Sequence, residues 1–299
     1  MSCEHSIIIA DRIEGLGGAH PLGSGGTEGS GGSEAEGGSP GTEPPVRPFF
    51  AEPQLIAELS DPDAKDQDPT LTGDLLEIFF FSDRTGEPEI WTAQRVSPEA
   101  LWQPPVQVLE LSSPELDMNP AVSLDGLRLW FHSQREPAGV WFTERNSRTD
   151  VWDPPAHADA FGWEIAPGPS ADELRMGLSV STDDNGREIY ESTRASTSDA
   201  WSVPLSIKGI NSPSDDSTPF LMGDGTEIFF SSARAGAGDL YWTTRPTLTD
   251  PVFEPEALVE LNDPGAFESH PHVAPDGGRI YFGSSRSGNT DLYEAVLER

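Results

Sequence analysis

Short apolar runs alternate with polar turn residues along most of the chain, and one unit of this kind recurs five times. Each unit has a turn dipeptide of the Asp-Gly type, then an apolar run that ends in Ser-x-Arg. Such a turn needs positive φ, and between β-rich runs it is the strongest local sign of a hairpin. The apolar runs are Ile78–Arg84, Leu129–Arg135, Ile189–Arg194, Ile228–Arg234 and Ile280–Arg286. The turn dipeptides are Gly73-Asp74, Asp125-Gly126, Asn185-Gly186, Asp224-Gly225 and Asp276-Gly277.

Two further apolar segments follow in most units. The first is an apolar pair such as Ile90-Trp91 or Leu240-Tyr241, and the second opens with an aromatic residue and a proline, as in Trp102–Leu111. Four short strands make one blade of a propeller, and such units must stack because none can bury both of its faces alone. The pattern therefore predicts an all-β fold, a five-bladed β-propeller of four-stranded blades.

The two ends of the repeated region predict how the propeller closes. The fifth unit stops at Arg299, after its third strand. Residues 50–59 (FAEPQLIAEL) closely match the fourth-strand segment 253–261 (FEPEALVEL). We therefore expect residues 50–59 to supply the outer strand of the last blade, which removes an open sheet edge.

The third unit departs from the pattern. Aligned on Ile189–Arg194, it has Leu178 where other units have a proline and Arg175 where they have a carboxylate. The interval from Trp152 to Leu178 is longer than its equivalents. An insertion near Ala156–Arg175 is predicted, and a degenerate sixth blade at that place is the alternative.

The last unit carries a family resemblance. Its segments Val273–Phe282 and Ser285–Tyr293 resemble the PD40, or WD40-like, repeat of the TolB family of bacterial periplasmic proteins. The resemblance covers roughly residues 48–299 and implies a propeller that acts as an interaction platform, or as a non-catalytic or substrate-gating part of a peptidase. TolB has an additional N-terminal α/β domain whose place is taken here by a tract of Gly, Ser and Glu. The resemblance therefore does not extend to the Tol-Pal partnership.

The N-terminal tract sets the domain organisation. Residues 15–46 are mainly Gly, Ser, Glu and Pro and cannot bury enough apolar surface to become ordered. We expect a disordered leader or tether over 1–47 and the propeller over 48–299.

Cys3 is the only cysteine, which excludes a disulfide framework. Its place before a flexible tract resembles a bacterial lipoprotein after cleavage, anchored by lipid in the periplasm or cell envelope. That interpretation requires a signal peptide upstream, because the apolar stretch Ile7–Ala10 is too short to be the core of one. The alternative is a disordered leader with an incidental cysteine.

The net charge of the chain limits the classes of partner that it is expected to bind. The chain has 51 acidic and 18 basic residues and a net charge of -33. Such a surface repels phosphate backbones, which argues against nucleic acid and anionic lipid and favours cations, basic partners or simple solubility. No apolar run approaches the roughly 20 residues of a membrane span. We expect a monomeric acidic protein.

A repeated carboxylate supplies the candidate site. In four units it stands three residues before a proline, and the four carboxylates are Asp66, Asp117, Asp216 and Glu268. We expect them at one mouth of the central channel, as a negative ring that binds a protein, a small ligand, or Ca²⁺ or another divalent cation. The alternative is that the arginines of Ser-x-Arg pair with them and tie loops together. His270 and His272 point to one face of a strand near Glu268, and either bind a metal or form a satisfied or exposed pair.

The sequence favours binding over catalysis. It has no Gly-x-Ser-x-Gly elbow, phosphate loop or zinc-protease helix, and we assign no catalytic residue and no organic cofactor. The leading interpretation is a non-enzymatic binding or scaffolding propeller of the bacterial cell envelope. The alternative is a carbohydrate-active hydrolase with its carboxylates at the channel mouth, because other five-bladed propellers are glycoside hydrolases.

Overall fold

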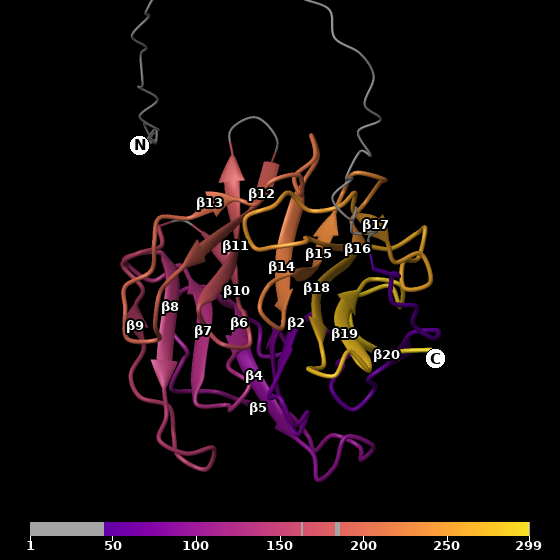
Figure 1. Ribbon diagram of the computed structural model, residues 1–299. Helices are drawn as coiled ribbons and strands as arrows, with labels where there is room; N and C mark the ends of the chain where they lie inside the picture. The colour runs from indigo at the N-terminus through magenta and orange to yellow at the C-terminus, as the bar shows by residue number, and fades with distance from the viewer. Residues whose placement is uncertain (1–44, 163, 183–185, 299) are drawn as a thin grey trace, which may run out of the picture. The chain divides into compact units, whose positions relative to one another are not determined.

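A computed structural model describes residues 45–162, 164–182 and 186–298, which form five four-stranded antiparallel sheets (Figure 1). Cys3 and most of the expected tether lie outside these residues. The innermost strands of the sheets, one per blade, are β2 (Asp66–Leu71), β6 (Asp117–Val122), β10 (Ile165–Pro169), β14 (Asp216–Met222) and β18 (Glu268–Val273). The five-bladed propeller is therefore confirmed, and the six-bladed alternative is excluded.

The remaining strands of each blade follow outward from the axis. The second strands are β3 (Glu77–Ser82), β7 (Arg128–Ser133), β11 (Arg175–Thr182), β15 (Glu227–Ser232) and β19 (Arg279–Ser284). The third strands are β4 (Glu89–Gln94), β8 (Gly139–Glu144), β12 (Gly186–Thr193), β16 (Asp239–Thr244) and β20 (Asp291–Val296). The outer strands are β5 (Val106–Gln107), β9 (Ala156–His157), β13 (Leu205–Ser206), β17 (Glu256–Ala257) and β1 (Gln54–Leu55).

The N-terminal strand closes the last blade, as the sequence predicts. Gln54 and Leu55 of β1 pair antiparallel with Glu294 and Tyr293 of β20. Ahead of β1, Phe50 forms a bridge with Leu297 and is buried in the core of the same blade. The blade that ends the chain is therefore completed by the first described strand.

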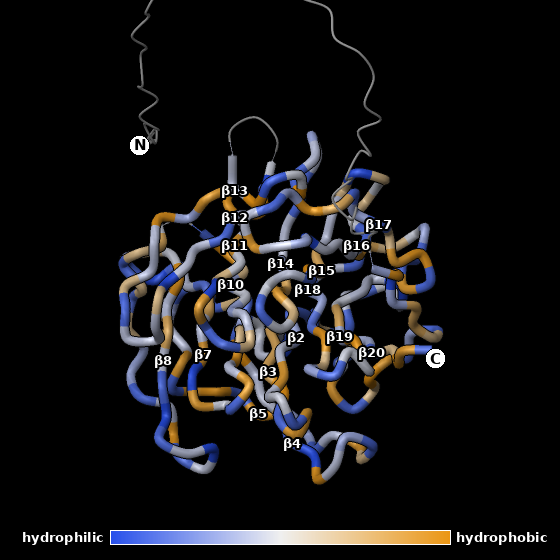
Figure 2. Tube along the Cα trace, in the orientation of Figure 1, coloured by the Kyte–Doolittle hydropathy of each residue, from blue (hydrophilic) through white to orange (hydrophobic). Residues whose placement is uncertain are grey.

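The core lies mainly between blades. One cluster joins Phe79 of the first blade to Phe131 and Trp152 of the second, with the rings of Phe79 and Trp152 edge to face at 5.8 Å. Figure 2 shows that apolar stretches (orange) alternate with polar turns (blue) along the chain. Each sheet buries both of its faces only by stacking on its neighbours, so the described blades are expected to unfold together.

The alignment of the third unit was wrong. Ala166 has φ 50°, and the equivalent positions before the prolines of the other inner strands have φ between 51° and 60°. Pro167 therefore stands at the repeated proline, in place of Leu178, and Glu164 at the repeated carboxylate, in place of Arg175. The segment Ala156–Arg175 contains β9 and β10 in regular order and no insertion.

Two local features explain this error. Strands β11 and β12 have eight residues each. Ile189–Thr193 therefore belongs to β12, the third strand of its blade, and Arg194 follows it, although the sequence of this segment resembles that of a second strand. The inner hairpin of this blade turns at Glu173, which takes φ 56° without being glycine. Asp172 supports the turn, since its Oδ1 accepts hydrogen bonds from Ser170 Oγ (2.6 Å) and Leu174 N (3.0 Å).

Candidate functional site

The four carboxylates predicted as a binding ring are fully buried, and each forms an ion pair within its own blade. The partner is the arginine of Ser-x-Arg in every case. The oxygen-to-nitrogen distances are 2.5 Å for Asp66–Arg84, 2.8 Å for Asp117–Arg135, 2.8 Å for Asp216–Arg234 and 3.1 Å for Glu268–Arg286. This geometry agrees with the alternative interpretation, in which the pairs tie loops together, and ligand binding by these groups stays a prediction.

Each of these arginines makes two further kinds of contact. Arg234 donates to Ile210 O (2.7 Å) and to Ser232 Oγ (2.8 Å). Its guanidinium lies over the rings of Phe230 and Tyr241, 5.2 and 5.0 Å from their centres. The arginine thus holds the loop that leads into the inner strand against the hairpin of the second and third strands. This contact positions the start of the inner strand. Burial raises the pKa of Asp66 and Glu268, although hydrogen bonds and the arginine charge act against it.

The side chains that face the central axis of the propeller are not the ion-paired carboxylates but a different set. Each inner strand has a register irregularity immediately before its proline, and the residue there has positive φ. A β-bulge of this kind re-aims a side chain, and the proline that follows cannot donate to the ladder. These positions are Asp68, Asn119, Ala166, Thr218 and His270. Of the predicted site residues, only His270 belongs to this set.

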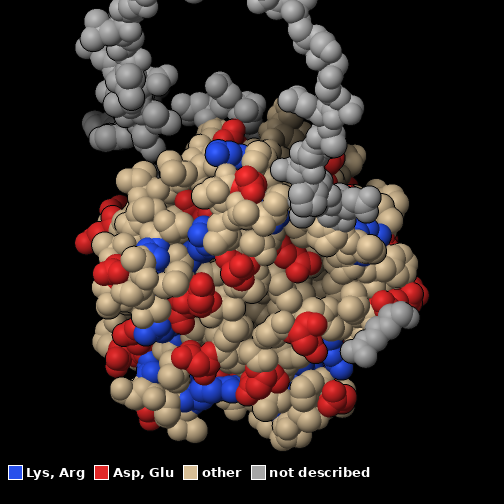
Figure 3. Space-filling view, in the orientation of Figure 1, with Lys and Arg blue, Asp and Glu red and all other residues tan. Residues whose placement is uncertain are grey.

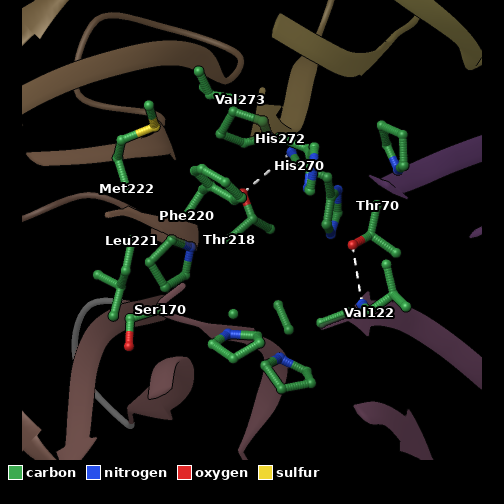
Figure 4. A pocket seen from close by; sticks show the side chains of 18 of the residues that line it. Thr70, Val122, Ser170, Thr218, Phe220, Leu221, Met222, His270, His272 and Val273 are labelled. Atoms are coloured by element: carbon green, nitrogen blue, oxygen red, sulfur yellow. Dashed lines mark hydrogen bonds between the residues drawn. The ribbon is translucent and has the colours of Figure 1, made fainter. Parts of the chain in front are cut away.

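The five inner strands line a central pocket that is open to solvent (Figure 4). Its walls are largely apolar and include Val122, Leu221 and Val273. The exposed fraction falls from 36% at Leu124, beside a hairpin turn, to 6% at Asn119 and 2% at Asp68. The hairpin-turn side of the pocket is therefore open, whereas the bulged residues range from 2% exposed at Asp68 to 18% for the side chain of His270.

Three polar side chains from different blades meet at the inner end of this pocket, and we call them the polar floor: Asp68, Asn119 and His270. Asp68 Oδ2 accepts hydrogen bonds from Asn119 N (3.1 Å) and Nδ2 (2.8 Å). Asn119 Nδ2 also lies 2.9 Å from His270 Nε2. His270 Nδ1 lies 2.9 Å from Asp68 Oδ1 and 3.0 Å from Ser269 Oγ. Asp68 and Asn119 were missed because the sequence analysis followed the carboxylates two residues earlier.

The second histidine of the predicted pair is held by the fold. His272 Nε2 accepts a hydrogen bond from Leu71 N (3.3 Å), and its ring packs edge to face on Phe220 at 4.8 Å. Burial lowers the pKa of His272 to about 3. Among the described residues, no group of three or more His, Cys, Asp and Glu side chains is placed to hold a metal ion.

Replacing His272 is expected to change the pH dependence of stability. Its pKa is 6.5 in the unfolded chain and about 3 in the folded one. Between these values the unfolded state binds more protons, so stability falls as pH falls below 6.5. From pH 6.5 to 4.5 the wild type should lose roughly 2–3 kcal/mol more than His272→Gln. Urea unfolding at both pH values measures this, and parallel losses in the two proteins would refute the assignment.

Comparison with known proteins identifies the fold. No protein-family model and no curated protein matches the sequence. The structure is similar to that of TolB from Acinetobacter baumannii, with a TM-score of 0.52, 15% identity, and coverage of 81% of this chain and 56% of TolB. The chain thus spans little more than half the length of that protein.

Enzymes share the same architecture. The α-L-arabinofuranosidase of Podospora anserina, solved in complex with cellotriose, matches with a TM-score of 0.56, 12% identity, and coverage of 84% of this chain and 96% of the enzyme. The catalytic domain of the GH62 α-L-arabinofuranosidase of Coprinopsis cinerea gives 0.57 and 11%, with the same coverage. At these identities the similarity concerns fold alone. The chain is a five-bladed β-propeller whose structure is similar to those of TolB and these arabinofuranosidases.

Proposed function

We propose that this propeller is a non-enzymatic binding protein that takes a small ligand, or a protruding segment of a protein, into its central pocket. The observation that carries the proposal is the composition of the pocket. Apolar side chains and prolines line it, and a few polar groups are gathered at its inner end. Binding sites for small molecules generally combine apolar walls with a small number of placed polar groups.

The same composition weighs against a carbohydrate-active hydrolase. Glycoside hydrolysis generally uses two carboxyl groups, one on each side of the scissile bond. Among the described residues that line the pocket, Asp68 is the only carboxylate. Asp66, Asp117, Asp216 and Glu268 are buried against arginines, where a sugar cannot reach them without breaking an ion pair.

The proposal includes a place of action at the bacterial cell envelope. Its support is the resemblance of the repeats to those of TolB, together with the shared fold. None of the described residues forms a helix with the length and hydropathy needed to cross a membrane. Fractionation of cells that produce the full-length protein from its natural gene tests this part of the proposal, and recovery in the cytosol alone would refute it.

The binding proposal is tested by blocking the pocket from two directions. Ala171→Trp adds bulk at the exposed mouth, and Ala121→Phe fills the wall from inside. Val203→Trp is the matched control, since Val203 is 79% exposed and lies outside the pocket lining. Ligand-observed NMR with a set of neutral fragments should show binding to the wild type and the control, and loss of at least tenfold in affinity in both pocket variants.

Two outcomes would overturn the binding proposal. The first is fragment binding that neither pocket variant affects. The second is turnover of arabinoxylan or xylo-oligosaccharides that Asp68→Asn abolishes, because the pocket would then be an active site. Both assays use the full chain with and without calcium.

A further inference from the structure

We infer that the ligand of the central pocket has an apolar body and a protonated amine at its end, and that Asp68 binds this amine. The inference rests on the proposed function and adds the chemical class of the ligand. It starts from two buried acceptors of the polar floor. Asp68 Oδ1 and Asn119 Oδ1 have no hydrogen-bond partner among the described residues, although their residues are only 2% and 6% exposed. A buried acceptor without a donor costs about as much as a lost hydrogen bond, so donors from a bound ligand would stabilise the floor.

Hydrogen-bonding contacts connect the three side chains of the polar floor. Asn119 Nδ2 donates to Asp68 Oδ2, and its second hydrogen faces His270 Nε2 at 2.9 Å. His270 Nδ1 in turn lies 3.0 Å from Ser269 Oγ.

His270 is a basic side chain of the lining, and its Nδ1 lies 2.9 Å from Asp68 Oδ1. The described lining residues include neither lysine nor arginine. The arginines of Ser-x-Arg in four blades are already engaged with the inner-strand carboxylates, as Arg84 is with Asp66 at 2.5 Å. An ammonium group would supply a positive charge beside the carboxylate and up to three donors, in a site where exclusion of water strengthens the interaction.

The rest of the pocket determines the body of the ligand. Toward the mouth the lining changes to Ala121, Val122, Leu221, Met222 and Val273, and Figure 4 shows the last four of these labelled around the space. An aliphatic or aromatic body placed there would displace water from apolar surface. A metal ion is less suited, because Ca²⁺ prefers six to eight oxygen ligands and the floor offers only a few.

The surface outside the pocket favours the same sign of ligand. Figure 3 shows Asp and Glu (red) spread over the visible face, with fewer Lys and Arg (blue). With a net charge of -33, the chain attracts cations and repels carboxylate ligands before they reach the mouth.

Matched ligands test the inference on the folded wild-type protein. n-Hexylammonium, n-hexanol and hexanoate have the same apolar body and differ in the end group. By isothermal titration at constant ionic strength, hexylammonium should bind about tenfold to a hundredfold more tightly than hexanol, and hexanoate more weakly than either. Ala171→Trp should weaken the binding of all three.

Two variants assign the preference to Asp68. Asp68→Asn retains the shape of the side chain and should reduce the ratio of hexylammonium to hexanol affinity to near one. Glu52→Gln removes the same charge from an exposed side chain and should leave that ratio unchanged. Near-ultraviolet circular dichroism checks the fold of each variant. If Asp68→Asn does not fold, the wild-type series and Ala171→Trp still decide.

The outcomes separate this inference from the proposed function. Equal affinities of hexylammonium and hexanol, both weakened by Ala171→Trp, would overturn the amine and leave the binding pocket standing. If none of the three ligands binds, the inference of an amine ligand is overturned. The fragment experiment then decides whether the pocket binds ligands at all. Displacement of hexylammonium by micromolar Ca²⁺ would show a metal site and overturn the inference as well.

Discussion

A chain that starts at residue 60 is expected to lose its cooperative fold, whereas a chain that starts at Pro45 should keep it. The shorter chain lacks β1 and three side chains that are buried in the core, Phe50, Ile56 and Leu59. Removing a large buried apolar side chain typically costs about 2–5 kcal/mol. Three such losses approach or exceed the roughly 5–15 kcal/mol by which folded proteins are stable.

The loss should extend beyond apolar contacts. Without β1, the edge of β20 is left unpaired and open to association with other chains. Arg84 also loses an acceptor, Leu59 O, at 2.6 Å. Circular dichroism during thermal unfolding, with gel filtration, compares the two truncated chains. Equal midpoints for the two would show that β1 does not close the propeller.

Asp117→Ala is expected to destabilise the protein by about 3–5 kcal/mol, because it leaves the Arg135 guanidinium without its buried partner. The control is Glu144→Ala, which breaks an exposed pair with Arg128, whose side chains are 54% and 34% exposed, and should cost about 0–1 kcal/mol. Urea unfolding measures both. In Asp117→Ala/Arg135→Met the total loss should be smaller than the sum of the single losses, since the two side chains act as a unit.

The same experiment separates scaffolding from metal binding at these carboxylates. If the pairs only tie loops together, calcium and chelator should leave the stability of the wild type and of Asp117→Ala unchanged. Stabilisation of the wild type by calcium that is absent in Asp117→Ala would indicate a metal ligand. A loss below 1 kcal/mol in the single variant would contradict the ion-pair assignment.

The blades could be predicted because the features that make them are local and repeated. Asp-Gly turns, Ser-x-Arg and the aromatic before each outer strand occur at similar spacings, and the matching segments 50–59 and 253–261 are enough to predict closure. The third blade was misaligned because Glu173 makes its turn without glycine and because β11 and β12 are long. Residue types alone predict neither the positive φ of Glu173 nor the length of β11 and β12.

The polar floor was hidden for a different reason. A repeat is detected from residues that stay the same, and the carboxylate and proline of each inner strand do so. The bulged residues between them are Asp68, Asn119, Ala166, Thr218 and His270, which share backbone geometry but no chemistry. Only the bulge shows that these side chains meet at the axis.

That bulge separates the residues that fix the loop leading into each inner strand from those that line the end of the pocket. In four blades the carboxylate at the start of the inner strand fixes the preceding loop through its ion pair with arginine. The proline after the bulge faces the channel and has no N–H to donate to the neighbouring strand. The side chain between them is free of both tasks, so it can differ in every blade while the backbone remains the same. Five neighbouring positions of this kind form a small combinatorial surface, and exchanging residues among them offers a way to give the same scaffold a new specificity.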